Sequence, residues 1–296
     1  MCILNFGSLN IDHVYQLAHI VAPGETISSP ALRHTSGGKG LNQSIALAKA
    51  GAQVYHAGCV GTDGKMLMEQ LREARVDTTH TQILDMVTGH AIIQVDKGGQ
   101  NSIIIHSGAN GALTEQMVDT TLSHFEKDTW VLMQNETSSV PYIARRCREQ
   151  GLTLAFNPSP YNEKLDTFPY EAVTYLLINE TEGRQISGET SPEKITGALL
   201  ARYPNMKIVL TLGDDGVYYA DREMRARQDA FHVDAIDTTG AGDTFTGFFL
   251  AMVMDGQPVE KALRCACAAA ALSVTKSGAA ASIPTMDEVN SFLANL

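Results

Sequence analysis

The feature that most constrains the fold of this chain is a regular alternation of apolar β-type runs with helical runs. Predicted strands cover 2–7, 54–60, 130–134, 153–156, 175–178 and 207–212. Predicted helices cover 65–74, 114–125, 138–150, 191–202, 242–255 and about 258–276, besides one that opens at 37–40 and ends at Gly51. Alternation of this kind implies an α/β fold with a mostly parallel central sheet and helices on both of its faces.

Other segments predict antiparallel strands. The residues at 10–36 lack a helical period and contain Pro and Gly breakers, and 88–106 holds two β-rich runs joined by a turn, which predicts a hairpin. These two segments together predict a small accessory β sheet. The runs 217–220 and 230–233 predict an antiparallel edge. The 296 residues are compatible with one α/β domain, 1–296, that carries both of these segments, since α/β proteins often reach this length as a single unit.

The run Gly240-Ala241-Gly242-Asp243 predicts a glycine-rich turn that leads into a helix. Apolar residues follow it at helical spacing, at Phe245, Phe248, Phe249 and Met252. The first N–H groups of a helix have no intrahelical partner, and they coincide with the positive end of the helix dipole. Glycines allow a ligand to approach such a backbone closely. The run therefore predicts an anion site, most often for phosphate.

Asp243 is the unexpected residue of this turn, because a carboxylate repels an anion. Its presence indicates a chemical role, and removal of a proton from an attacking hydroxyl is the obvious one. The alternative is that Asp243 only caps the helix, a place where Asp is favoured.

Composition and charge exclude several classes of protein. The formal net charge of −11 argues against nucleic acid as a partner, because phosphate backbones require a basic face. No apolar run reaches the length of a membrane span, and the N-terminus lacks the basic start and cleavage site of a secretory signal. The five cysteines show no metal-like pairing, which indicates reduced thiols in a cytoplasmic protein.

Polar motifs follow several of the predicted strands directly. They are Asn10 with Asp12, the run 134–136, Asn157 with Pro158, the run 179–182 and the run 211–213. Ligands bind beyond the C-terminal ends of parallel strands, so these motifs are expected to meet in one cleft.

Each motif also has a structural alternative. Asn10 and Asp12 could hold sugar hydroxyls or simply form a turn. Glu136 could bind a sugar or be a surface acid. Asn179 and Glu182 could orient the water shell of a magnesium ion, or could form a helix-capping pair.

Several common active-site patterns are missing from the sequence. There is no G-x-x-x-x-G-K-[ST] and no G-x-G-x-x-G after a strand, which argues against a Walker-type site and against a nicotinamide or flavin enzyme. The histidines lack metal-ligand spacing, and no serine lies in a nucleophile elbow.

Taken in order, the motifs resemble those of the ribokinase family of ATP-dependent carbohydrate kinases over essentially the whole chain. The landmarks are GSLNIDH (7–13), GGKGLNQ (37–43), SGANGAL (107–113), NPSP (157–160), NETE (179–182), TLGDDG (211–216) and DTTGAGDTF (237–245). The spellings of GGKGLNQ and SGANGAL are closest to the members after which the family is named.

The resemblance implies transfer of a phosphoryl group from ATP to the terminal hydroxyl of a small sugar, with ribose as the first expected acceptor. Asp243 would be the general base, and the amides of Gly240, Ala241 and Gly242 would form the anion hole. The residues implied to hold the sugar are Asn10, Asp12, Gly38, Lys39, Asn42 and Glu136, together with Asp243.

The resemblance also implies nucleotide and cation sites. The residues expected along ATP are Asn179, Glu182, Thr211, Gly213, Gly242 and Cys267, with Glu182 near Mg²⁺ through water. A monovalent cation, expected to be K⁺, would be held by Asp237, Thr239, Ser273, Lys276, Gly278 and Ser282. The resemblance further implies that the accessory strands at 10–36 and 88–106 form a β lid over the active site, and that this lid is also the interface of a homodimer.

Two departures from the family pattern leave alternatives open. His90 and Gln94 lie in the predicted lid, where more apolar residues are expected. If they face the sugar, the acceptor would be another pentose, a ketose or a nucleoside. Cys267 stands where the family often has a histidine near adenine. A non-catalytic regulator that binds sugar or nucleotide is a further alternative, against which the intact Asp243 counts.

Overall fold

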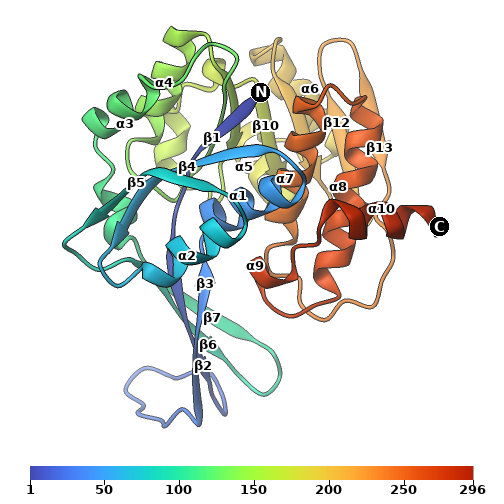
Figure 1. Cartoon of the computed structure of the whole chain (residues 1–296). Helices are drawn as coiled ribbons and strands as arrows, with labels where there is room; N and C mark the ends of the chain where they lie inside the picture. Colours follow the sequence, from blue (N-terminus) through green and yellow to red (C-terminus); the bar gives the residue numbers. More distant parts are fainter. Residues whose placement is uncertain (296) are drawn as a thin grey trace.

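A mostly parallel sheet of nine strands forms the centre of the molecule, in the order β13-β12-β11-β10-β9-β8-β1-β4-β5 (Figure 1). The computed structural model describes residues 1–295. The strands are β1 (Cys2–Phe6), β4 (Gln53–Gly61), β5 (Asp77–Leu84), β8 (Trp130–Gln134), β9 (Thr153–Asn157), β10 (Tyr175–Asn179), β11 (Lys207–Thr211), β12 (Val217–Ala220) and β13 (Arg225–Gln228). All pairings from β5 to β11 are parallel, and β12 is antiparallel to both of its neighbours.

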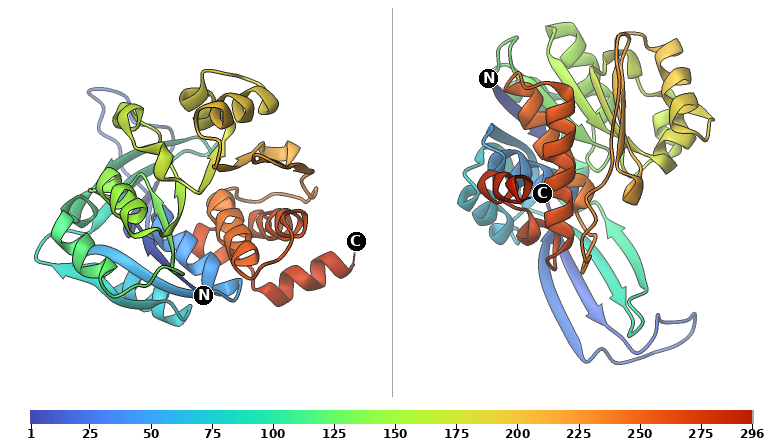
Figure 2. Two further views of the ribbon diagram at one scale, coloured as in Figure 1. Left: turned by 90° about the horizontal axis from the view of Figure 1, so that it is seen from above. Right: turned by 90° about the vertical axis from the view of Figure 1, so that its right-hand side faces the viewer.

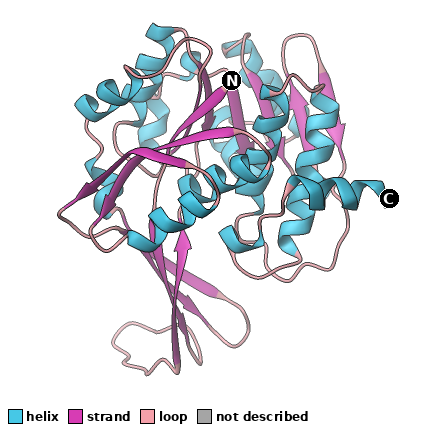
Figure 3. Cartoon of the chain, in the orientation of Figure 1, coloured by secondary structure: helices cyan, strands magenta, loops and turns pink. Residues whose placement is uncertain are grey.

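Helices cover both faces of this sheet (Figures 2 and 3). They are α1 (Lys39–Lys49), α2 (Lys65–Glu73), α3 (Glu115–Leu122), α4 (Val140–Gln150), α5 (Glu180–Ser187), α6 (Pro192–Arg202), α7 (Ala241–Met254), α8 (Val259–Val274), α9 (Ala279–Ser282) and α10 (Met286–Ala294). Short 3₁₀ helices are η1 (Gly108–Ala112), η2 (Glu163–Thr167), η3 (Tyr170–Ala172) and η4 (Gly213–Asp215). The predicted fold class is confirmed.

The strands are apolar throughout because both of their faces are buried. Ile3 of β1 belongs to the hydrophobic cluster shared with α1, α7 and α8, whereas its neighbour Leu4 belongs to the cluster shared with α3, α4 and α6. Successive side chains of a strand point to opposite faces, so one continuous apolar run supplies two cores.

A second sheet of four strands, in the order β3-β2-β6-β7, projects from the body of the molecule (Figures 1 and 2). It consists of β2 (Asn10–Gln16), β3 (Ala31–Gly37), β6 (Gly89–Val95) and β7 (Asn101–His106). We call it the lid sheet. It is built from the segments that lack a helical period in the sequence.

Two sequence-based expectations at the C-terminal part are wrong. The edge strand after β12 is Arg225–Gln228 rather than 230–233. The Asp221 carboxylate accepts hydrogen bonds from the backbone N–H groups of Glu223 and Met224, both at 2.8 Å, which closes a tight turn and fixes an earlier register. The predicted pair of final helices is followed by α9 and α10. A capping box of Thr285 and Glu288 starts α10, a local signal that is present in the sequence.

None of the helices formed by residues 1–295 has the length and apolar character needed to cross a lipid bilayer.

Candidate active site

Asp243 lies in the first turn of α7 and is 6% exposed. The N-cap of α7 is Gly240, whose φ of 77° is left-handed, and it makes no side-chain capping bond. The Asp243 carboxylate instead accepts hydrogen bonds from Nδ2 of Asn42 and Nε2 of Gln43, each at 2.9 Å. The alternative that Asp243 merely caps the helix is therefore wrong, because its side chain is turned toward α1.

Close packing of α1 on α7 creates this contact. A Cβ built on Gly247, one turn after Asp243, would lie 2.4 Å from the Cβ of Ala46 and 2.7 Å from the backbone nitrogen of Leu47. Only glycine allows such an approach. Gly247 therefore lets the first turns of the two helices present Asn42 and Gln43 to Asp243.

A cavity of about 130 Å³ opens beside Asp243 at the C-terminal ends of the strands. It is lined by Lys39, Asn157, Ser159, Leu177, Ile178, Asn179, Glu182, Thr211, Gly242, Asp243, Phe245 and Thr246. The structure thus brings six of the predicted site residues together although they come from α1, β10, α5, β11 and α7. Parallel strands that end at one edge explain the convergence.

Glu136 lies at the side of this cavity where the predicted sugar residues meet. Its Oε2 accepts hydrogen bonds from Oγ of Ser8 at 2.5 Å and from the backbone N–H of Lys39 at 2.9 Å. Burial raises the pKa of Glu136. The carboxylates of Asp243 and Glu136 in turn raise the pKa of Lys39. The cluster therefore holds the ammonium of the partly buried Lys39 between two carboxylates, that of the partly buried Glu136 and that of the buried Asp243.

Asn10 and Asp12 extend the site along β2. Asn110 of η1 donates from Nδ2 to Oδ1 of Asn10 at 2.7 Å, and its own Oδ1 accepts from the backbone N–H of Leu9 at 2.9 Å. Burial, followed by the nearby charge of Glu136, raises the pKa of Asp12 to about 6. Gly38, with a φ of 93°, lets the chain turn from β3 into α1 beside these residues.

His90 and Gln94 lie on the face of the lid sheet opposite to Asp12. Within β6, Ala91 is the register partner of Asp12, and side chains alternate along a strand, so His90 points the other way. The His90 ring contacts the ring of His13 at a centroid distance of 5.6 Å, and Gln94 accepts a hydrogen bond from the backbone of Val21. The premise that these side chains reach the sugar is wrong.

On the Asp12 face of the lid sheet, the middle residues of β6 and β7 are apolar. Ile105 of β7 is the register partner of Ala91, and Ile93 follows Ala91 two residues later on the same face. The β6 and β7 residues that share the face of Asp12 therefore match the apolar character that the family resemblance implies for the lid.

The residues predicted along the nucleotide lie on the far side of the cavity. Asn179 and Glu182 do form the capping box that was the structural alternative, with bonds of 2.9 and 3.0 Å. Both nevertheless line the cavity with Thr211, and Gly213 follows in η4. Cys267 does not line it: the thiol is buried in α8, and burial raises its pKa to about 12.

The residues predicted to hold a monovalent cation lie on two adjacent loops. The Asp237 carboxylate accepts from the backbone N–H groups of Thr239 and Gly278, both at 2.9 Å, which ties the loops together. The hydroxyls of Ser273 and Ser282 donate to backbone carbonyls nearby. The Lys276 ammonium pairs with Glu288 at 3.1 Å, so only its backbone could serve this site.

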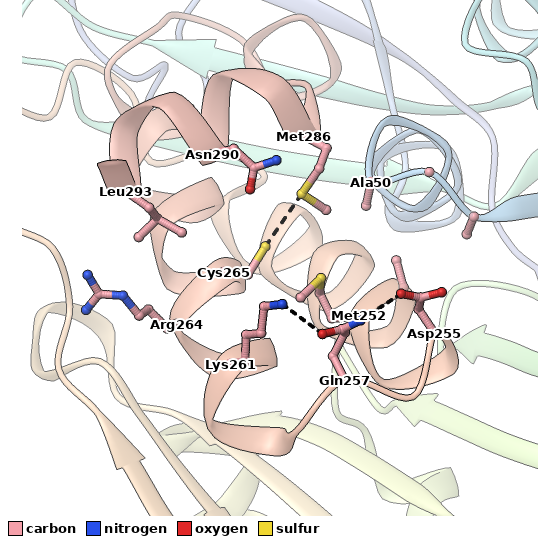
Figure 4. A pocket seen from close by; sticks show the side chains of 13 residues that line it. Ala50, Met252, Asp255, Gln257, Lys261, Arg264, Cys265, Met286, Asn290 and Leu293 are labelled. Atoms are coloured by element: carbon pink, nitrogen blue, oxygen red, sulfur yellow. Dashed lines mark hydrogen bonds between the residues drawn. The ribbon is translucent and has the colours of Figure 1, made fainter. Parts of the chain in front are cut away.

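A second cavity, of about 560 Å³, lies at the other end of α7 (Figure 4). Met252, Lys261, Cys265 and Met286 are among the side chains that line it. It contains none of the predicted site residues, and the length of α7 separates it from Asp243.

Three polar residues that support the site do not follow from the sequence motifs. Gln43 belongs to the motif at 37–43, Asn110 to the motif at 107–113 and Gln134 to the run 134–136. These motifs do not indicate what the three side chains contact. Each makes its contact with a residue that is distant in the sequence, as in the pair of Gln43 and Asp243, and only the fold supplies that information.

The comparisons with known proteins agree along the whole chain. Residues 3–286 match the profile of the pfkB family carbohydrate kinases. The chain is 36% identical to a ribokinase of Haemophilus influenzae, over 97% of this chain and 96% of that protein. It superposes on the ribokinase of Thermotoga maritima with a TM-score of 0.88 and 33% identity, over all of both chains. It also superposes on an Arabidopsis thaliana ribokinase complexed with ribose and ATP, with a TM-score of 0.87 and 30% identity, over 99% and 98% of the two chains. The chain belongs to the pfkB family of carbohydrate kinases.

Proposed function

We propose that this protein transfers the terminal phosphoryl group of ATP to the terminal hydroxyl of ribose. The observation that carries the proposal is the position of Asp243, a carboxylate at the N-terminus of α7 that is held between the sugar-side cluster and the cavity. The relative solved with ribose and ATP supports both substrates.

In this proposal Asp243 takes the proton of the attacking hydroxyl, and the amides of Gly240, Ala241 and Gly242 would face the transferred phosphoryl group. The amide of Ala241 would give up its long hydrogen bond to the carbonyl of Thr238, at 3.3 Å, to do so. Phosphoryl transfer mainly requires positioning and stabilisation of charge, which helix N-terminal amides provide. Asn10, Asp12, Gly38, Lys39, Asn42 and Glu136 would hold the sugar. The buried Asn42 Oδ1 has no partner within residues 1–295, so it fits a hydroxyl donor from the sugar.

The test is a coupled ADP-release assay with a panel of sugars and nucleosides, using wild type and Asp243→Asn. Wild type is expected to turn over ribose, and the variant to lose about 100- to 10,000-fold in kcat, as is typical for removal of a general base. Ribose binding by calorimetry and the melting temperature serve as folding controls. Turnover of ribose by the variant at the wild-type rate excludes Asp243 as the base. Binding without any turnover in wild type favours the non-catalytic regulator.

The far side of the cavity fits a nucleotide and a hydrated magnesium ion. Glu182 supplies a carboxylate at the cavity wall, and Mg²⁺ usually keeps several waters and binds through one or two carboxylates and phosphates. Asn179, Thr211 and Gly213 would lie along ATP. Cys267 makes no direct contact in this proposal, because its thiol is buried. Glu182→Gln is expected to raise the Mg²⁺ concentration needed for half-maximal rate, measured with ATP saturating.

The loops joined by Asp237 fit a monovalent cation. The Asp237 carboxylate accepts two backbone N–H bonds, which leaves oxygen lone pairs free, and the neighbouring carbonyls of Thr239 and Gly278 are oxygen donors of the kind that K⁺ prefers. Replacing K⁺ by tetramethylammonium in the assay is expected to lower the rate, and Asp237→Asn is expected to remove that cation dependence.

We also propose a homodimer formed through the lid sheet. The supporting observation is the run Ile103, Ile104 and Ile105 on the edge strand β7, where the side chains are 51%, 60% and 59% exposed. An apolar edge strand is a template for pairing with another chain. The double variant with Ile103→Lys and Ile104→Lys is expected to sediment as a monomer under conditions in which wild type is a dimer.

A further inference from the structure

Behind Asp243 lies a buried chain of side-chain amides that the proposed reaction does not use. Nε2 of Gln43 donates to Asp243 at 2.9 Å, and Oε1 of Gln43 accepts from Nε2 of Gln134 at 2.7 Å. The same Gln134 nitrogen donates to Oδ1 of Asn5 at 2.9 Å. Gln43, Gln134 and Asn5 are at most 1% exposed, so the chain lies in the interior of the protein.

Backbone carbonyls fix the direction of every amide in this chain. Asn5 donates from Nδ2 to the carbonyl of Gly40 at 2.9 Å, and a carbonyl can only accept, so Asn5 must present its oxygen to Gln134. Gln134 must then use its nitrogen toward Asn5, and the second hydrogen of that nitrogen points at the oxygen of Gln43.

Asn157 fixes Gln43 from the other side. Nδ2 of Asn157 donates to the carbonyl of Leu177 at 2.8 Å, so its oxygen is the atom that meets Nε2 of Gln43 at 3.3 Å. Two independent contacts therefore turn the N–H₂ group of Gln43, and not its oxygen, toward Asp243. An amide that could flip would place an oxygen against the carboxylate and repel it.

We propose that Gln43 is a positioning residue for the Asp243 carboxylate, and that Gln134 keeps Gln43 in the donating orientation. The inference rests on the proposed function, because Asp243 is the general base there. A neutral amide suits this role because it orients the ionised carboxylate and stabilises its charge without being able to transfer a proton.

The site gives the two donors of Asp243 different surroundings. Asn42 donates a hydrogen bond from Nδ2 to Oδ2 of Asp243. The Oδ1 atom of Asn42 has no hydrogen-bond partner among residues 1–295, so this oxygen can also contact the sugar. Both functional groups of Gln43 are instead used within the protein. Loss of Gln43 is therefore expected to change kcat, whereas loss of Asn42 is expected to change sugar binding as well.

The experiment compares wild type with Gln43→Met and Gln134→Met, which keep the side-chain volume and remove the amide. Gln150→Met is the matched control, at a half-exposed position at the end of α4 that makes no contact with the site. The readouts are kcat, KM for sugar, KM for ATP, the pH profile of kcat and the melting temperature.

Gln43→Met is expected to lower kcat by about 10- to 150-fold, the range expected for a lost hydrogen bond to a charged group, with both KM values changed by less than about threefold. The acid limb of its pH profile is expected to move to higher pH, because the ionised carboxylate loses a donor. Gln134→Met is expected to show the same changes to a smaller degree, since Gln43 then loses one of the two contacts that fix its orientation and keeps the contact with Asn157.

A wild-type kcat and pH profile in a folded Gln43→Met protein overturns the proposal. A loss of melting temperature with no shift of the pH profile reduces Gln43 to a structural role and also overturns it. If wild type turns over no sugar in the panel, the proposed function fails on its own. The positioning claim is then decided by the crystal structure of Gln43→Met, in which an Asp243 carboxylate in its wild-type orientation contradicts it.

Discussion

The carboxylate of Asp12 lies directly against the backbone of Gly37 in the neighbouring strand of the lid sheet. A Cβ built on Gly37 would be 2.1 Å from Oδ2 of Asp12, a separation that no side chain can adopt. The contact shows that this glycine makes room for a carboxylate of the protein itself. Asp12 can occupy its place on the sugar side only because position 37 carries no side chain.

Gly37→Ala is accordingly expected to displace Asp12 and raise KM for ribose by at least about tenfold, which corresponds to the loss of a hydrogen bond to a charged group. KM for ATP is expected to change less than about threefold. Initial rates with each substrate varied measure both. Gly197→Ala in α6 is the control, because a Cβ there meets no atom within 4 Å. An unchanged KM for ribose contradicts the placement of Asp12 in the sugar site.

Asp12→Asn is expected to stabilise the sugar-free protein. Burial raises the pKa of Asp12 from 3.8 to about 6, so the stability that its protonated form provides is present below pH 3.8 and is lost as pH rises through 6. At neutral pH the ionised group then costs up to about 3 kcal/mol. The variant is expected to melt several degrees above wild type at pH 7.5 and at the same temperature near pH 3.8. A lower melting temperature of the variant at pH 7.5 contradicts this.

His56 is expected to make the protein sensitive to acid. It is completely buried, and burial lowers its pKa from 6.5 to about 4, so its contribution is present above pH 6.5 and is lost as pH falls toward 4. The loss amounts to at most about 3 kcal/mol, and protonation of Asp12 partly offsets it in the same range.

Urea unfolding of wild type and His56→Gln at matched pH values isolates the histidine. The difference in unfolding free energy between the two proteins is expected to be largest above pH 6.5 and to shrink by pH 4. A difference that is independent of pH would show that His56 does not charge on unfolding in this range.

Asn110→Ala is expected to weaken both the fold and the sugar site. The side chain bonds Oδ1 of Asn10 and the backbone N–H of Leu9, and both partners are buried. Leaving such groups unpaired costs about 1–3 kcal/mol, so the melting temperature should fall by several degrees and KM for ribose should rise. Asn101→Ala, at the exposed start of β7, is the control. Equal melting temperatures for both variants contradict the prediction.

The sequence by itself determined the alternation that makes a parallel sheet and the start of α7 at Gly240 to Asp243. It also determined that polar motifs gather where the strands end. These features depend on periodicity, turn residues and helix N-termini, which act over a few residues and so can be read locally. The same local nature explains the wrong edge strand at 230–233: the run Arg225–Gln228 has no β-branched or aromatic residue, and it is a strand because the turn at Asp221 sets it beside β12.

Only the tertiary structure decided which distant side chains meet. Asp243 and its two donors are about 200 residues apart, and their contact depends on the close crossing of α1 and α7 at Gly247. The pairing register of the lid sheet decided that His90 turns away from Asp12, because a shift by one residue would reverse every side chain. Such choices are made by packing between elements, and no short stretch of sequence contains them.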